Sequence, residues 1–244
     1  MIERTHDQKM RDLLLERYGN LDHSPLRHRL RFYLKRIGWL GVVKGSYLVK
    51  RALDVVASAI LLVLLMPVFL AVAVAIRLED PGPILFKQTR VGRWGSLFTM
   101  WKFRSMYTDA EERKKDLMAQ NEMQGGVIFK MKDDPRVTKV GRVIRKTSID
   151  ELPQLWNVLK GEMSLVGPRP PVPQEVNEYS LSDRRRLEVI PGITCIWQVS
   201  GRSDIPFDQQ VELDVEYIES QSFWTDVKIL LKTVPALLFG TGAY

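Results

Sequence analysis

Cysteine and histidine are scarce in this sequence of 244 residues. The only cysteine is Cys195, and the three histidines, His6, His23 and His28, all lie near the N-terminus. A single cysteine excludes an internal disulfide and fits a reducing compartment. No Cys/His cluster has the spacing of a zinc site, so any metal should be a hard, oxygen-bound ion. The N-terminus also lacks the pattern of a cleavable secretory signal.

Net charge is missing from most of the chain. Residues 1–51 contain 12 Lys and Arg against 5 Asp and Glu, whereas residues 52–244 contain 24 of each, so the whole excess of +7 belongs to the N-terminal segment. A nucleic-acid-binding enzyme more often spreads its basic patch over the folded body, so we expect no nucleic acid partner. A basic arm beside an apolar segment instead predicts contact with anionic membrane lipid, with a solvated charge run as the alternative.

Only one uncharged segment reaches membrane length. Residues 55–76 run for 22 positions without a charge and contain Pro67 near the middle. An interior proline removes a helical hydrogen bond and clashes with the preceding turn, so Pro67 should break the helix. Basic residues flank both ends, at Lys44, Lys50, Arg51, Arg77, Lys87, Arg90 and Arg93. Because a full span would export one of these clusters, we expect a re-entrant helix that enters and leaves on the cytoplasmic side.

Patterns outside this segment predict a mainly α fold with a small β-hairpin. The hairpin is expected at 84–88 and 97–102, and helices at 108–123 and 207–220. Residues 26–40 have apolar positions at steps of four and three among basic residues, which predicts an amphipathic helix on the membrane or against the body. The apolar segment 227–239 is too short to span a bilayer and should form an interfacial helix. The run Arg184–Arg186 predicts a helix face or a membrane contact.

Two adjacent carboxylates, Asp150 and Glu151, stand between cations on both sides. Ser148 can cap a helix here with Glu151 as its capping-box partner, which is the structural alternative to a chemical role. Consecutive helical residues point about 100 degrees apart, so the two acids cannot share one small ligand. They suit two separate tasks, one as a nucleophile and the other as a ligand of a divalent cation. Asp133-Asp134-Pro135 could also bind a metal, although an Asp before Pro is more often turn chemistry.

Several cations near these acids could bind phosphate. Gly167-Pro168-Arg169-Pro170 predicts a stiff turn that presents Arg169, whose planar fork matches phosphate oxygens. Arg145 lies five residues before Asp150 and should sit near the same helix end. Lys102 and Arg104 are two residues apart and on a strand would point the same way, as a phosphate clamp. The alternative for each is a solvated surface charge.

At these residues the chain resembles the bacterial sugar transferases, which are polyprenyl-phosphate hexose-1-phosphate transferases, also known as monotopic phosphoglycosyl transferases. The resemblance runs in order from about Lys50 to Val234. The motifs that carry it are Lys102-Phe-Arg-Ser-Met106, Arg145-x-x-x-x-Asp150-Glu151-Leu-Pro-Gln154, Asn157-Val-Leu-Lys-Gly161, Met163-Ser-Leu-Val-Gly-Pro-Arg-Pro170, Pro191-Gly-Ile-Thr194 and Glu212-Leu-Asp214 with Tyr217-Ile218. Family members usually carry Gly where this chain has Cys195.

The resemblance implies a monotopic membrane protein that moves a sugar 1-phosphate from a UDP-sugar to undecaprenyl phosphate. Asp150 would attack the sugar-bearing phosphorus, and Glu151 would hold Mg2+. Arg145, Arg169, Lys102 and Arg104 would bind phosphate oxygens, and Pro67 matches the family's membrane break. The place of action would be the cytoplasmic face of the bacterial inner membrane, in polysaccharide assembly.

We therefore expect three parts. Residues 1–46 form a basic amphipathic extension, residues 47–80 a re-entrant membrane helix, and residues 81–244 a cytoplasmic catalytic domain with interfacial C-terminal helices. The sequence is compatible with a homo-oligomer. The alternative function is a non-catalytic, membrane-anchored scaffold of a glycan assembly complex.

Overall fold

The computed structural model describes residues 26–110, 112–113, 134–201 and 205–239, and the chain divides into two compact units, 1–49 and 50–244. Helix α2 (Leu26–Leu64) begins in the first unit and continues into the second without a break at residue 46. The helix predicted at 26–40 is therefore present, and its residues Leu30, Tyr33 and Leu34 are exposed. The polar lead-in before Ser24, most of the predicted helix 108–123, and Asp133 lie outside the described residues.

Helix α2 meets α3 (Met66–Glu79) at a bend of 59°. Pro67 lies in the first turn of α3, where its missing N–H cannot bond to the carbonyl of Val63, so the α2 ladder stops at Leu65. In the described part of the chain, no single helix is long and apolar enough to cross a membrane. The bent pair Gly45–Leu64 with Met66–Glu79 passes that test only when the two helices are taken together.

Strands β1 (Leu85–Val91) and β2 (Leu97–Phe103) form the predicted hairpin, with both strands longer than expected. The antiparallel register pairs Arg90 with Phe98 and Phe86 with Lys102. Since side chains alternate along a strand, Arg90, Met100 and Lys102 lie on the same face of this sheet. The hairpin thus brings cations from two strands to one surface.

A second, parallel pair joins β3 (Ser164–Val166) to β4 (Gly192–Thr194). No sequence pattern predicted this pair, because each strand has three residues and the partners lie far apart in the chain. The pairing depends on close backbone approach, since a Cβ on Gly192 would collide with the backbone of Gly167. This pair fixes the start of the Gly167–Pro170 turn, where the amide of Gly167 donates to Thr194 O at 3.0 Å.

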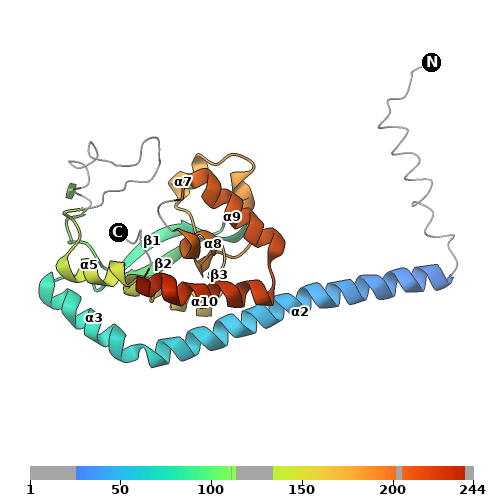
Figure 1. Cartoon of the computed structure of the whole chain (residues 1–244), viewed down its shortest axis with the longest axis horizontal. Coiled ribbons are helices and arrows are strands. Elements are labelled where there is room, and N and C mark those ends of the chain that lie inside the picture. Colours follow the sequence, from blue (N-terminus) through green and yellow to red (C-terminus); the bar gives the residue numbers. More distant parts are fainter. Residues whose placement is uncertain (1–25, 111, 114–133, 202–204, 240–244) are drawn as a thin grey trace, which may run out of the picture. The chain divides into compact units, whose positions relative to one another are not determined.

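Helices supply most of the remaining structure, so the prediction of a mainly α fold with a small hairpin is confirmed (Figure 1). Helix α9 (Phe207–Ser220) has the predicted bounds, and α10 (Phe223–Phe239) begins four residues earlier than expected. The other elements are α5 (Lys139–Lys146), η4 (Ile149–Glu151), α6 (Gln154–Lys160), α7 (Pro173–Asn177), η5 (Asp183–Leu187), α8 (Ile196–Ser200) and the turn η2 (Arg93–Gly95).

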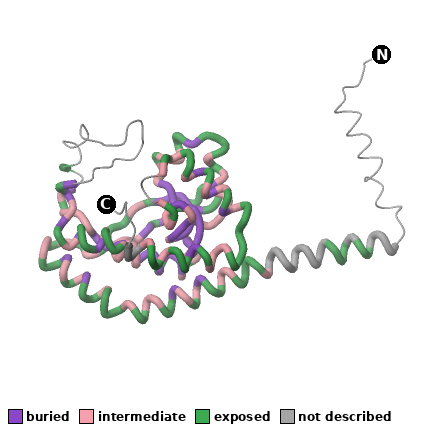
Figure 2. Tube along the Cα trace, in the orientation of Figure 1, coloured by how far each residue is buried: buried purple, intermediate pink, exposed green. Residues whose placement is uncertain are grey.

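Three apolar clusters form the core of the second unit. They consist of Val72, Ile76, Phe103 and Ile144; of Phe98, Met100, Val158 and Met163; and of Val166, Tyr217 and Ile229. Figure 2 shows the buried residues concentrated in the body, whereas α3 and the part of α2 in this unit alternate between exposed, half-buried and buried positions. The buried positions of the bent pair are Asp54, Ser58, Val72 and Ile76, and the last two pack in the first cluster.

The run Arg184–Arg186 lies in the helix η5, as one of the two predicted alternatives had it, but Arg186 is buried. Its guanidinium lies 2.7 Å from the carboxylate of Asp214, and neither side chain is more than 4% exposed. The rings of Tyr179 and Phe207 flank the same guanidinium at 5.8 and 5.6 Å. A buried arginine is stable here because a carboxylate from α9 and two aromatic faces replace its water.

Candidate active site

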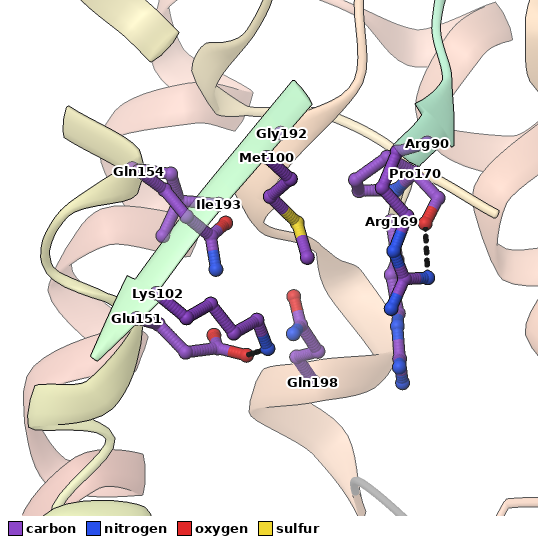
Figure 3. Close-up of a pocket in the computed structure, with 10 residues that line it drawn as sticks. All are labelled: Arg90, Met100, Lys102, Glu151, Gln154, Arg169, Pro170, Gly192, Ile193 and Gln198. Carbon is purple, nitrogen blue, oxygen red and sulfur yellow. Dashed lines mark hydrogen bonds and ion pairs between the residues drawn. The ribbon is translucent and has the colours of Figure 1, made fainter. Parts of the chain in front are cut away.

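One pocket gathers residues from β1, β2, the Asp150–Glu151 turn, the Gly167–Pro170 turn, β4 and α8. Its lining consists of Arg90, Met100, Lys102, Glu151, Gln154, Arg169, Pro170, Gly192, Ile193 and Gln198 (Figure 3). The space, including open solvent at its mouth, is about 240 Å³. Sites for whole drug-sized ligands usually enclose about 300 to 1,000 Å³, so this pocket suits one charged portion of a larger substrate.

Glu151 and Lys102 form an ion pair on one side of the pocket. The Lys102 Nζ donates to Glu151 Oε1 at 2.6 Å, and the two side chains are 19% and 29% exposed. Burial raises the pKa of Glu151, but the charge and hydrogen bond of Lys102 outweigh it, and the net result is a lowered pKa. Glu151 is therefore ionised at neutral pH, with Oε2 not engaged by Lys102.

Asp150 differs from its neighbour because it is buried without such a pair. In the described part of the chain no cation lies within ion-pair distance of its carboxylate, and its side chain is not part of the pocket lining. Burial raises the pKa of Asp150 to about 6, against the opposing charges of Lys102 and Arg145. A carboxylate of this kind is ionised for the most part at pH 7 and more basic than an ordinary aspartate.

The capping box, which was the structural alternative for Ser148 and Glu151, is not formed. Ser148 has φ 54° and makes no side-chain capping bond, and Ile149–Glu151 is a single 3-10 turn. Glu151 does not reach back to Ser148 because Lys102 on β2 offers its carboxylate a charge-assisted bond. The left-handed residue reverses the chain between α5 and η4, and this reversal buries Asp150 while it leaves Glu151 at the pocket.

Two arginines lie on the opposite side of the pocket from the Glu151–Lys102 pair (Figure 3). Arg169, from the predicted stiff turn, is exposed, whereas Arg90 on β1 is 5% exposed. Burial lowers the pKa of Arg90 to about 10, with help from the charge of Arg169. Arg90 also donates to Pro170 O at 2.8 Å, so it supports the turn that carries Arg169.

Sequence reasoning placed Arg90 among the charges that flank the membrane segment and did not identify its place in the pocket. The alternation of side chains along the predicted hairpin could have placed Arg90 in the pocket, because it puts Arg90 and Lys102 on the same face of the sheet. Gln154 and Gln198 were also missed as lining residues. Gln154 is 3% exposed, and the amide of Gln198 lies between the two charged sides in Figure 3.

Two other predicted phosphate ligands lie outside the pocket lining. Arg145, in the last turn of α5, is near enough for its charge to lower the pKa of Asp150. Arg104 follows the end of β2, and its guanidinium pairs with the carboxylate of Asp80 at 2.9 Å. Lys102 and Arg104 therefore do not act as one clamp in this arrangement. Asp134, a weaker metal candidate, is paired with Arg136 at 2.6 Å.

The donor set determines which metal the pocket can hold. Among the described residues, no group of three or more His, Cys, Asp or Glu side chains converges on one point. A dedicated protein cage is therefore not present in that part of the chain. Mg2+ is commonly held by one or two carboxylates together with substrate phosphates, and Glu151 supplies one such carboxylate across the pocket from Arg90 and Arg169. The residues present fit a metal that arrives with a phosphorylated substrate.

These groups can perform phosphoryl chemistry. A buried, weakly paired carboxylate can attack phosphorus, and the cations on both sides of the pocket can neutralise phosphate oxygens during the transfer. Positioning and charge neutralisation are the main requirements of such reactions.

Comparison with known proteins agrees with this chemistry. Residues 45–240 match the family model described as "Bacterial sugar transferase". Galactosyl transferase CpsE of Streptococcus agalactiae is 49% identical over 91% of this chain and 47% of its own length. The chain therefore spans about half the length of that relative.

Two further relatives are covered over more of their length. The exopolysaccharide production protein ExoY of Rhizobium meliloti is 38% identical over 80% of this chain and 88% of its own length. A UDP-glucose:undecaprenyl-phosphate glucose-1-phosphate transferase of Caulobacter vibrioides is 43% identical over 80% of this chain and 72% of its own length. The matched region contains the hairpin, the carboxylate pair and both turns that line the pocket.

Proposed function

The chain belongs to the bacterial sugar transferase family, and from this premise we propose that it transfers a sugar 1-phosphate from a UDP-sugar to undecaprenyl phosphate. The products are UMP and an undecaprenyl-diphosphate sugar. This reaction is a first membrane step in the assembly of bacterial exopolysaccharide or lipopolysaccharide. The observation that carries the proposal is the buried Asp150 carboxylate beside a pocket with cations on two sides.

In the first half-reaction, an oxygen of ionised Asp150 attacks the phosphorus that bears the sugar. The bond from this phosphorus to the bridging oxygen breaks, and UMP leaves with that oxygen and its electron pair. The product is a phosphosugar-aspartyl enzyme. Because the pKa of Asp150 is about 6, its carboxylate is for the most part ionised at pH 7 and can attack without a neighbouring base.

In the second half-reaction, a phosphate oxygen of undecaprenyl phosphate attacks the same phosphorus. The bond to the Asp150 oxygen breaks, and the carboxylate is regenerated in its ionised form. Both steps transfer one phosphoryl group between oxygens, so neither an oxidant nor a net proton is required.

The cations divide the phosphate charge between them. Arg169 and Arg90 face the donor from one side of the pocket, and Lys102 faces it from the other. Arg145 contributes its charge near Asp150, and a phosphate contact of Arg104 would require it to leave Asp80. Glu151 would hold Mg2+ through the oxygen that Lys102 does not use, and the bound metal would neutralise the diphosphate and stabilise the leaving UMP.

The bent pair α2–α3 supports an arrangement in which the body sits on the cytoplasmic face of the inner membrane. We propose that the pair enters one leaflet and returns at the break beside Pro67, and that α10 and the basic arm contact anionic lipid. Single cysteines at Ser46 and Leu78, in a Cys195→Ser background, should be labelled from the same side in oriented vesicles. Labelling from opposite sides would refute the re-entrant topology.

The catalytic proposal is tested with purified protein, a panel of UDP-sugars, Mg2+ and undecaprenyl phosphate. The wild type should release UMP and accumulate labelled sugar phosphate on the protein, whereas Asp150→Asn should do neither. Asp208→Asn, an equal change at an exposed position of α9, should leave both signals unchanged. Near-normal turnover by Asp150→Asn would refute the covalent route. Absence of UMP release with every donor would favour the scaffold.

A further inference from the structure

The bent helix pair is bonded to both helices that flank the catalytic turn, defined here as residues 147–153 between α5 and α6. This turn contains Asp150 and Glu151 and has no regular element of its own beyond the 3-10 turn η4. Its geometry therefore depends on where α5 ends and where α6 begins. Three groups of contacts from α2 and α3 determine those two positions.

Arg51 on α2 holds the C-terminal end of α6. Its NH1 donates to Val158 O at 2.6 Å and its NH2 to Leu159 O at 2.8 Å. Both carbonyls belong to the last turn of α6, where the amide of Gly161 donates to Val158 O at 3.0 Å and Arg51 adds a side-chain bond to each carbonyl. The chain leaves α6 at Gly161, whose φ of 86° and closeness to the Arg51 guanidinium leave little room for a side chain. Arg51 thus caps and orients α6 from outside.

Glu79, the last residue of α3, holds the N-terminal end of α5. Its two carboxylate oxygens accept the amides of Lys139 and Val140, each at 2.7 Å. The side chain of Thr138 accepts the amide of Gly141 at 2.8 Å, so three amides at the start of α5 are bonded. Two of the three bonds therefore come from the helix pair rather than from α5 itself. A carboxylate also complements the positive end of this helix dipole.

An apolar contact joins α3 to the residues beside the reacting groups. Val72 and Ile76 pack in one cluster with Phe103 and Ile144, and Ile149 packs against this cluster. Phe103 adjoins Lys102 in the chain, and Ile149 adjoins Asp150. A shift of α3 would therefore be transmitted directly to both groups.

From these contacts we propose that Arg51 and Glu79 are positioning residues, which hold α6 and α5 so that the Asp150 carboxylate meets the donor phosphorus in line. The inference rests on the proposed function and goes beyond it, because it assigns the bent pair a part in catalysis as well as in membrane attachment. Neither residue lines the pocket, and the hydrogen bonds of both go to backbone groups of α6 and α5, so they act on the reaction through the catalytic turn. Their effect must appear in the rate of the chemical step and not in donor affinity.

The experiment measures UMP release in a single turnover, with enzyme in excess of a UDP-sugar that the wild type uses. The first-order rate constant at saturating enzyme does not depend on the fraction of protein that is active. A misplacement of about 1 Å at a reacting centre costs on the order of 100-fold in rate, so Arg51→Met and Glu79→Gln should each slow release by about 10- to 100-fold. The enzyme concentration that gives half the maximal single-turnover rate reports donor binding and should change less than about twofold.

Two comparisons separate positioning from a loss of folded protein. Arg51→Lys keeps an ammonium that can bond both carbonyls, so it should restore most of the rate that Arg51→Met loses. In the double variant Arg51→Met/Glu79→Gln, the fold-reduction of the rate constant should be smaller than the product of the two single fold-reductions. The reason is that both residues act on one turn.

Asp226→Asn is the matched control, because it weakens the 2.6 Å ion pair between Lys50 on α2 and Asp226 on α10 without touching the catalytic turn. Its rate constant should stay within about twofold of the wild type. Wild-type rate constants in both Arg51→Met and Glu79→Gln would overturn the inference while leaving the proposed function intact. Absence of UMP release by the wild type would instead refute the proposed function.

Discussion

Replacing Asp150 with Asn should stabilise the folded protein at neutral and alkaline pH. The reason is that burial raises the pKa of Asp150 from 3.8 to about 6, so the folded state resists ionisation of this acid more than the unfolded state does. Each pKa unit corresponds to about 1.4 kcal/mol, so an ionised Asp150 lowers the free energy of unfolding by about 3 kcal/mol. The Asn side chain has nearly the same shape and carries no charge.

The sign and the pH window follow from the two pKa values. Below pH 3.8 Asp150 is protonated in both the folded and the unfolded state, so it does not lower the free energy of unfolding. Between pH 3.8 and about 6 the unfolded state releases its proton first, so wild-type stability falls as the pH rises. Above about pH 6 the full cost is present. The advantage of Asp150→Asn should therefore be about half complete at pH 5 and complete at pH 8.

Thermal unfolding in detergent, without Mg2+, measures this effect. For a unit of this size, about 3 kcal/mol corresponds to a rise in Tm of roughly 6 to 12 °C at pH 8. Glu151→Gln provides the opposite case at the adjacent position, because its ion pair with Lys102 lowers the pKa of Glu151 and stabilises the fold. That variant should melt below the wild type at pH 8. An Asn variant no more stable than the wild type at pH 8 would refute the reasoning.

Three shorter predictions test other parts of the structure. Arg186→Met should lower the free energy of unfolding by about 3 to 5 kcal/mol, because it leaves Asp214 buried and unpaired. Chemical denaturation should show that Arg186→Met/Asp214→Leu regains part of this free energy. Burial raises the pKa of the Cys195 thiol, so iodoacetamide should label it at pH 8 only after unfolding, as mass spectrometry can determine. Lys102→Met should lower kcat/KM by on the order of 100-fold, and an unchanged value would exclude its contact with the transferred phosphate.

Local pattern was sufficient for the hairpin, for α9 and for the break beside Pro67. Each depends on residues close together in the chain, namely strand alternation, helical periodicity and a missing N–H. The adjacency of Asp150 and Glu151 likewise pointed to the segment that lines the pocket through Glu151. What the sequence could not provide was the conformation of that segment, in which Ser148 is left-handed and Glu151 pairs with Lys102 from a distant strand.

Features that depend on distant contacts were missed for a common reason. From its sequence neighbours Arg186 resembles a surface charge, and only the fold places Asp214 of α9 next to it. Arg90 resembles a charge that flanks the membrane segment, and only the hairpin register places it on the face of the pocket. The β3–β4 pair has no periodicity to detect over three residues. In each case a charge or a backbone segment is buried by a partner whose position only the whole fold determines.

The contrast between the two adjacent acids follows from one local feature, the 3-10 turn between α5 and α6. The Glu151 side chain points from the turn toward Lys102, which stabilises its charge. Asp150 is buried, so its charge lowers the free energy of unfolding. The proposed reaction needs one carboxylate as the nucleophile and the other as a stable anion that can hold a metal. The 3-10 turn provides this difference because it buries Asp150 and pairs Glu151 with Lys102. We infer that the bonds of Glu79 and Arg51, which hold α5 and α6 from outside, help the turn to keep Asp150 buried. If loosening those bonds left the difference in stability between Asp150→Asn and the wild type unchanged at pH 8, the burial of Asp150 would have to be maintained by the body alone.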